Sequence, residues 1–217
     1  MTPLFLTLKV AFLATVGAMI LGVAAAYTLT RSRFWGHDLV EVLFSLPLVL
    51  PPTVLGYYLL VLIGRHGLIG RWLRDSFGIS LIFTWQGAVL AAMVVALPLV
   101  FKSAGAAFAA VNRQCEEAAA TLGASGLVIF FRVSLPLAWR GILAGGMLAF
   151  ARAMGEFGAT LMVAGNLPGR TQTLSMAVYD AVQAGDFRHA NGLVLIITLV
   201  SGIILYGSGK LFQSGWR

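Results

Sequence analysis

The sequence predicts an all-α fold, a polytopic membrane helical bundle of about five transmembrane helices in one domain that includes residues 1–217. Three observations lead to it. Hydrophobic residues make up 59% of the chain and charged residues only 11%, with a mean hydropathy of +0.90, whereas soluble domains carry about 25% charged residues. The apolar residues form several stretches long enough to cross a bilayer. The basic residues gather at the ends of these stretches, as expected of a membrane protein.

Five segments are long and apolar enough to span the membrane. They cover residues 5–29, 39–63, 81–101, 137–163 and 193–211. Small residues recur at four-residue spacing from Ala14 to Ala26, and such a stripe lets another helix approach closely. We expect the first segment to be retained and not cleaved as a signal peptide, because Lys9 interrupts its apolar run and Arg31 follows it at once.

Two connections between spans carry their own local signals. Residues 64–80 include Arg65, Arg71 and Arg74, which predicts a surface loop with a short amphipathic turn. Between the fourth and fifth spans, the apolar positions of residues 173–182 fall at helical spacing. This spacing predicts a short interfacial helix.

The second span contains three prolines, Pro47, Pro51 and Pro52. Each proline lacks a backbone N–H and leaves a carbonyl without its helical partner, so we expect the span to kink or unwind here. Inside a membrane this is tolerated only where protein or a watery cavity satisfies the freed groups. A kink that serves packing and a gate that lines a pathway both fit the sequence.

The fourth span contains two ionisable residues, Arg152 and Glu156. On a continuous helix they would share a face, and each is the obvious partner for the other. A charge at mid-membrane costs about 2.5–3.5 kcal/mol on insertion scales, so the pair must face protein or water. Either the two residues form a buried ion pair that fixes helix packing, or Arg152 attracts an anion into a translocation path while Glu156 weakens its binding.

Residues 112–136 predict a helix-turn-helix between the third and fourth spans. Asn112 is placed to cap a helix over residues 113–122, and Gly123 is placed to end it in a left-handed conformation. Ser125 is placed to cap a second short helix through about residue 131. Pro136 suits the first turn of the next membrane helix, where its missing N–H costs nothing.

One motif runs through this segment. Glu117-Ala118-Ala119 is followed after three residues by Gly123, and then after nine more by Val133, one further residue and Leu135-Pro136. The pattern resembles the cytoplasmic EAA loop of bacterial ABC importer permeases. The resemblance implies that the segment docks into a cleft of a separate ATPase subunit. The implied coupling residues are Glu117, Ala118, Ala119, Gly123, Leu135 and Pro136.

Three further stretches extend the resemblance along nearly the whole chain. Residues 46–57 look like the second-helix signature of molybdate ABC transporter permeases. Residues 150–160 are similar to a signature shared by molybdate and sulfate permeases, and residues 164–173 also fit. The resemblance implies the type I ABC importer permease fold and molybdate as substrate. Tungstate and sulfate or thiosulfate are the alternatives, and tungstate, nearly identical in shape and charge, is not separated from molybdate by the sequence.

The same resemblance implies a set of partners. Two copies of the chain would form a homodimer, which would bind two ATPase subunits and receive the anion from a periplasmic molybdate-binding protein. ATP and magnesium would lie on the ATPase, with no cofactor in this chain. Closure of the ATPase dimer would drive alternating access by rigid-body motion.

The motif also sets an expected orientation in the bacterial inner membrane. If the loop 112–136 is cytoplasmic, the N-terminus lies outside and the C-terminus inside. The cytoplasmic side then carries Arg31, Arg33, Lys102, Arg113, Arg132, Arg140, Lys210 and Arg217. The outer side carries Arg65, Arg71, Arg74, Arg170 and Arg188. This bias toward the cytoplasm has the expected sign.

Motifs for enzymatic chemistry are missing from the sequence. It contains neither a G-x-x-x-x-G-K-[ST] nucleotide loop nor an H-E-x-x-H metal motif. Its three histidines lie in three different loops, at His37, His66 and His189. We therefore expect no catalytic residue and no metal site. We also expect the positive charge to serve the contact with the lipid bilayer and not the binding of nucleic acid. An integral-membrane enzyme or a channel subunit is the alternative class of function.

Overall fold

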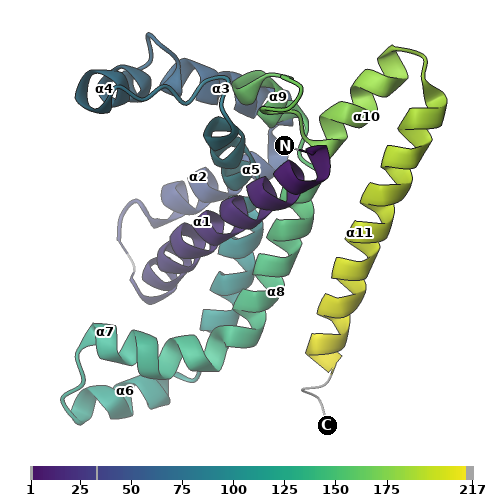
Figure 1. Cartoon of the computed structure of the whole chain (residues 1–217). Helices are drawn as coiled ribbons and strands as arrows, with labels where there is room; N and C mark the ends of the chain where they lie inside the picture. Colours follow the sequence, from purple (N-terminus) through teal and green to yellow (C-terminus); the bar gives the residue numbers. More distant parts are fainter. Residues whose placement is uncertain (1, 33, 214–217) are drawn as a thin grey trace.

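The computed structural model of the chain describes residues 2–32 and 34–213. Over these residues the fold is helical, with no strand. The elements are α1 (Pro3–Arg31), α2 (His37–Val49), α3 (Pro52–Ile63), α4 (Leu68–Phe77), α5 (Trp85–Ala109), α6 (Arg113–Thr121), α7 (Gly126–Ile129), the π-helical η1 (Phe130–Ser134), α8 (Leu135–Met154), α9 (Gly158–Ala164), α10 (Leu174–Gln183) and α11 (Phe187–Gln213). Figure 1 shows their arrangement as an elongated bundle.

By length and composition, four of the helical segments could cross a membrane, and a bent pair could supply a fifth span. The four are Pro3–Arg31, Trp85–Ala109, Gly126–Met154 and Phe187–Tyr206, and the bent pair is α2 with α3. The prediction of an all-α bundle of about five spans is confirmed. The first span also lies close to its predicted bounds.

α1, α5 and α8 pack against one another in the centre of the bundle. Their contacts depend on small residues: Ala14 and Ala18 of α1 are fully buried, and a Cβ atom at Gly22 would lie 3.0 Å from Val100 Cγ1 on α5. A Cβ atom at Gly145 of α8 would lie only 2.7 Å from the Cβ of Ser103. Small residues let the helices approach closely enough for dispersion contacts to accumulate, as in other membrane bundles.

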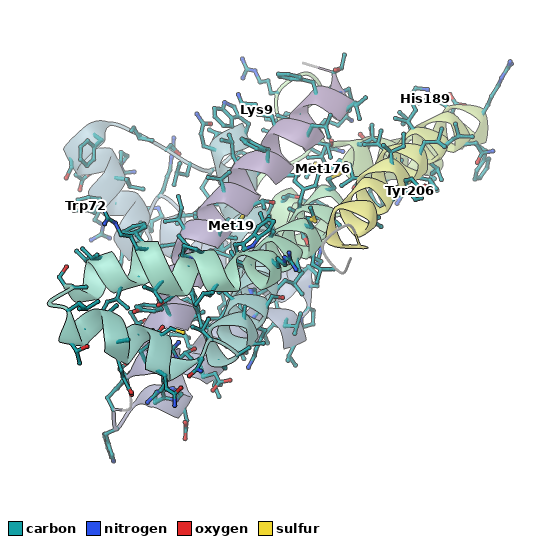
Figure 2. The ribbon with its side chains drawn as sticks, turned by 90° about the horizontal axis from the view of Figure 1, so that it is seen from below. Lys9, Met19, Trp72, Met176, His189 and Tyr206 are labelled. Atoms are coloured by element: carbon teal, nitrogen blue, oxygen red, sulfur yellow. The ribbon has the colours of Figure 1, made fainter. Side chains whose placement is uncertain are left out.

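Lys9 is accommodated within the first span by an aromatic partner. Its ammonium lies 3.6 Å from the centroid of the Trp85 ring, at the start of α5. A cation over an indole face is attracted by the ring quadrupole. Figure 2 labels Lys9 on α1.

The second span is broken, as its prolines predict. Pro47 lies inside α2, Pro51 immediately precedes α3, and Pro52 opens it. The two helices meet at an angle of 118°. Pro51 and Pro52 cannot donate backbone hydrogen bonds, so the helix cannot continue through them, while α3 can start there because its first N–H groups need no helical partner.

The fourth span differs from the predicted continuous helix over residues 137–163. The helical segment begins earlier, at Gly126, and α8 ends at Met154. The chain then leaves the helix for three residues and resumes as α9. The break is stabilised by Glu156, whose side chain accepts a hydrogen bond from the backbone N–H of Ala159 and so caps the new helix.

The third and fifth spans also have different bounds from those predicted. The third begins at Trp85 and not at residue 81, because the Thr84 hydroxyl caps α5 by accepting from the N–H of Gly87 at 3.2 Å. It runs on to Ala109, past the predicted end at residue 101. The fifth begins at Phe187 and not at residue 193.

The connections carry the two short helices expected of them. α4 corresponds to the amphipathic turn of residues 64–80 and ends at Gly78, which has a φ of +66°. α10 corresponds to the interfacial helix of residues 173–182. It is fixed to α1 because the Thr7 hydroxyl accepts from the N–H of Leu174 at 2.8 Å.

The two ends of the bundle are built differently. α6 and α7 lie together at one end, while α4, α9, α10 and the start of the chain lie at the other (Figure 1). Figure 2 looks along the molecule with α6 and α7 nearest the viewer and shows α11, with Tyr206, set to one side. α11 contacts α10 and α8, and it leaves apolar side chains such as Leu195, Leu199 and Ile203 exposed.

Candidate functional site: the α6–α7 hairpin and two broken spans

The α6–α7 hairpin, residues 113–129, forms where the sequence predicts it, but the Ser125 side chain makes no capping hydrogen bond to α7, contrary to the prediction. The Asn112 side chain caps α6 by accepting from the N–H of Gln114 at 3.0 Å. α6 ends at Thr121, one residue earlier than predicted. Gly123 has a φ of +84°, a conformation that glycine adopts without the steric cost that a Cβ atom would add.

The junction between the hairpin and α8 differs from the prediction. The sequence predicts that Pro136 opens a new helix after a second short segment, but α7 continues without a break through η1 into α8. In η1 the N–H of Leu135 donates to the carbonyl of Phe130, five residues back. A π-helical turn widens the backbone, and this lets the chain carry the Pro136 ring and its missing N–H without ending the helix.

The free end of the hairpin is apolar and exposed. Leu122 is 89% exposed and Leu127 is 74% exposed, and Phe131 of η1, nearer the base, is 61% exposed. Of the predicted coupling residues, Glu117, Ala118, Gly123 and Pro136 are exposed, and Ala119 and Leu135 are half-buried. Exposed large apolar side chains gathered on one surface are typical of a site that contacts another protein or a membrane.

The base of the hairpin holds a polar contact that the sequence analysis missed. Glu116 Oε1 accepts hydrogen bonds from Arg31 Nη2 at 2.8 Å and from Ser134 Oγ at 2.6 Å. The sequence analysis placed Arg31 after the first span and assigned no partner to Glu116. Since 85 positions separate the two residues, no local pattern indicates their contact.

The structure brings Arg152 and Glu156 together. Arg152 Nη1 donates to Glu156 Oε2 at 2.7 Å. The Glu156 side chain is 1% exposed and the Arg152 side chain 35% exposed. The two residues do not share a face of one continuous helix, because α8 ends between them, and Glu156 also caps α9 through Ala159. Each carboxylate oxygen thus has a hydrogen-bond donor, while about a third of the Arg152 side chain is exposed.

The two breaks in the spans lie against each other. A Cβ atom at Gly158, the first residue of α9, would lie 3.1 Å from the Cβ of Pro52, the first residue of α3. One turn further on, a Cβ atom at Gly56 would lie 3.0 Å from the Cα of Ala159. Non-helical backbone is tolerated at membrane depth only where protein buries it or where it lines a watery cavity, and here each break is covered in part by the other.

The family described as "Binding-protein-dependent transport system inner membrane component" matches residues 18–214. The chain belongs to this family. It is the membrane-spanning permease subunit of an ABC importer, and its type I importer fold agrees with the resemblance of the loop 112–136.

Individual relatives of the permease are similar over most of its length. The molybdenum transport system permease protein ModB of Escherichia coli strain K12 is 43% identical, over 92% of this chain and 87% of its own. ModB of Haemophilus influenzae is 41% identical, over 97% of this chain and 90% of its own. A Chlorella vulgaris protein named "Probable sulfate transport system permease protein cysT" is 34% identical, over 90% of this chain and 73% of its own.

Solved structures share the fold of the permease at low sequence identity. The MetNI methionine ABC transporter, solved in inward-facing conformations, matches with a TM-score of 0.74 at 16% identity, over 98% of this chain and 94% of that chain. A bacterial ABC transporter that imports alginate matches with a TM-score of 0.73 at 15% identity, over 98% of this chain and 78% of that chain.

Within residues 2–32 and 34–213, no group of three or more histidine, cysteine, aspartate or glutamate side chains is placed to hold a metal ion. Cys115 is exposed on α6.

Proposed function

We propose that this permease carries molybdate into the bacterial cell by alternating access, driven by a separate ATPase. The observation that carries the proposal is the 41–43% identity to molybdenum permeases over more than nine-tenths of the chain, against 34% to the sulfate relative. Tungstate has nearly the same size and charge as molybdate and is expected to share the path.

The exposed end of the α6–α7 hairpin is the proposed ATPase contact. Its apolar side chains would lose water on docking, which favours association at about 25 cal/mol per Å² of apolar surface buried. The turn at Gly123, with its φ of +84°, would set the angle between the two helices, and a displacement of the docked ATPase would push on the hairpin. ATP and magnesium would bind to the ATPase, and this chain would hydrolyse nothing on its own.

Two copies of the permease are proposed to pair, with two ATPase subunits on one side and a periplasmic binding protein on the other. α2 and α3 leave large apolar side chains such as Leu39, Leu48 and Tyr57 exposed, which suits a second copy or lipid. The proposed orientation puts the hairpin and the C-terminus in the cytoplasm and the N-terminus outside. The start of α1 and the hairpin lie at opposite ends of the bundle (Figure 1), which supports this orientation.

The translocation path is proposed to pass the two breaks. Transporters commonly place their substrate sites where membrane helices are interrupted, because free backbone groups and helix ends can then face the substrate. Arg152 lies beside the break in the fourth span with 35% of its side chain exposed. A guanidinium carries five N–H donors, so Arg152 is proposed to attract the oxyanion with donors that Glu156 does not occupy, while Glu156 keeps the attraction weak enough for release.

Transport in a defined system tests the substrate. Proteoliposomes would contain the permease and its ATPase, with the binding protein outside and ATP inside, and would be given labelled molybdate. We expect ATP-dependent uptake that excess tungstate abolishes and excess sulfate leaves intact. ATP-dependent uptake of labelled sulfate without uptake of molybdate would contradict the proposed substrate. Uptake without an ATPase would favour a channel subunit, and turnover of a substrate by the permease alone would favour a membrane enzyme.

A further inference from the structure

The contact at the base of the α6–α7 hairpin joins four separate elements. Arg31 is the last residue of α1, Phe108 lies in the last turn of α5, Glu116 lies in the first turn of α6, and Ser134 ends η1. Arg31 donates to Glu116 Oε1 from Nη2 at 2.8 Å and from Nε at 3.2 Å. The same Nη2 also donates to the carbonyl of Phe108 at 3.0 Å. Ser134 completes the set from the side of α8, with its hydroxyl 2.6 Å from Glu116 Oε1.

The surroundings strengthen this contact. The side chains of Arg31 and Glu116 are only 17% and 13% exposed, and Ser134 is fully buried. An ion pair shielded from water is screened less than one on the surface. Both charges also sit at favourable helix ends, because a cation is stabilised at a helix C-terminus and an anion near a helix N-terminus.

An aromatic cluster of Tyr27, Phe108 and Phe130 joins α1, α5 and η1. The ring of Tyr27 lies 4.7 Å from that of Phe130 and 5.2 Å from that of Phe108, measured between centroids. Phe130 is the first residue of η1, so the α7 side of the hairpin is anchored to α1 and α5 by apolar packing. The α6 side is anchored by Arg31 and Glu116.

We propose that the Arg31–Glu116 ion pair makes the hairpin rigid against α1 and α5, so that movement of a docked ATPase reaches the membrane helices. This inference rests on the proposed function of the hairpin as the ATPase contact. Without the ion pair, α6 would remain attached through the short link to α5 and the turn to α7, and bending at these links would absorb the displacement. Arg31 and Glu116 are positioning residues, since neither touches the ATPase surface or the substrate path.

The test uses the permease–ATPase complex in proteoliposomes. Arg31→Gln, Glu116→Gln and the double variant would be compared by the number of molybdate ions imported for each ATP hydrolysed. We expect this ratio to fall about tenfold in both single variants, equal to about 1.4 kcal/mol of coupling free energy. The double variant should be no worse than either single one, because both substitutions remove the same contact. Arg31→Lys should lower the ratio of molybdate to ATP less than Arg31→Gln does, because an ammonium retains the positive charge but not the planar set of N–H donors of the guanidinium.

A second measurement needs neither substrate nor ATPase. Cys115 is the only cysteine of the chain and is exposed on α6, so a nitroxide attached to it reports how freely α6 moves in the permease dimer. We expect higher nitroxide mobility in Arg31→Gln and Glu116→Gln than in the unmodified permease. The matched control is Lys102→Gln with Glu41→Gln, which removes an ion pair of 2.7 Å between α5 and α2 that is about half exposed. This double substitution should leave the mobility of the nitroxide unchanged.

The outcomes separate the inference from the proposed function. Unchanged nitroxide mobility in the Arg31 and Glu116 variants would overturn the inference even if transport fell, because the residues would then act elsewhere. An unchanged transport ratio despite higher mobility would overturn the coupling role. Failure of the unmodified complex to import molybdate would reject the proposed substrate, and the inference would then be judged on mobility together with stimulation of ATP hydrolysis by the binding protein.

Discussion

Gly158 lies so close to Pro52 that a Cβ atom at position 158 would be 3.1 Å from the proline Cβ. The two residues open α9 and α3, the helices that follow the two breaks. Their contact places one break against the other, beside the Arg152–Glu156 ion pair. The interruptions of the second and fourth spans are therefore one structural feature, built from a proline-rich segment and a glycine-rich segment that meet in the fold.

The first prediction concerns this contact. Gly158→Val adds a branched side chain whose nearest neighbours are the Pro52 ring and the backbone nitrogen and methyl group of Thr53, none of which is the end of a long flexible side chain. Overpacking of this kind costs about 1–3 kcal/mol, so we expect a lower Tm of the purified permease and reduced uptake. Gly155→Ala is the matched control, because its Cβ atom would meet nothing closer than 3.9 Å. Equal Tm values for the two variants would show that the breaks do not depend on close packing.

Most of the fold could be predicted from the sequence, because local patterns determine it. Asn112, Gly123 and the prolines at 47, 51 and 52 act within a few residues of themselves, and the structure has the predicted cap, turn and kink at these positions. The break at residues 155–157 was missed because glycine is common in membrane helices and glutamate is a good helix former, so neither residue signals an interruption. What ends the helix there is packing against α3 and the cap supplied by Glu156.

In the candidate site, too, the local features could be predicted from the sequence and a long-range contact could not. The hairpin is one continuous segment with a motif, so its residues could be named in advance. The pair of Arg152 with Glu156 could also be expected, because two charges in an apolar span need each other. The contact of Arg31 with Glu116 could not be predicted, because it joins the ends of helices that are far apart in the sequence.

The second prediction concerns the turn of the hairpin. Gly123→Val places a β-branched residue at a φ of +84°, a conformation that costs an L-residue about 1–2 kcal/mol. The turn should relax and change the angle between α6 and α7, so we expect the permease to insert normally but to lose the ATPase on copurification or to lose transport-linked hydrolysis. Gly126→Ala, in a helical conformation with open space around it, is the control. Full uptake and normal ATPase association in Gly123→Val would show that the turn does not set the docking angle.

The third prediction is the orientation of the chain. Cys115 is exposed on the proposed cytoplasmic hairpin. A membrane-impermeant thiol reagent should leave Cys115 unlabelled in intact cells and label it in inside-out vesicles. Because Cys115 is the only cysteine of the chain, Cys115→Ser gives the background. Labelling in intact, right-side-out cells would reverse the proposed positions of both termini.

The fourth prediction separates the two roles of the Arg152–Glu156 pair. Glu156 is 1% exposed, whereas Arg152 is 35% exposed, so the two single variants are not equivalent. Arg152→Gln leaves a buried carboxylate without its cation, which is strongly unfavourable. Glu156→Gln leaves a cation that water can reach and retains a side-chain oxygen able to accept from Ala159. We therefore expect a lower Tm and less assembled complex for Arg152→Gln than for Glu156→Gln.

The double variant then decides whether Arg152 also meets the anion. With both charges removed, the carboxylate is no longer unpaired, so the Tm and the amount of complex should recover toward those of Glu156→Gln. If Arg152 attracts molybdate, the double variant should still import poorly. Loss of a charge-assisted contact of about 1.5–3 kcal/mol would lower the uptake rate about tenfold or more. Recovery of both assembly and uptake would show that the pair serves packing alone. Normal assembly and normal uptake in all three variants would reject both roles, because neither the buried carboxylate nor the open guanidinium would then depend on the contact between them.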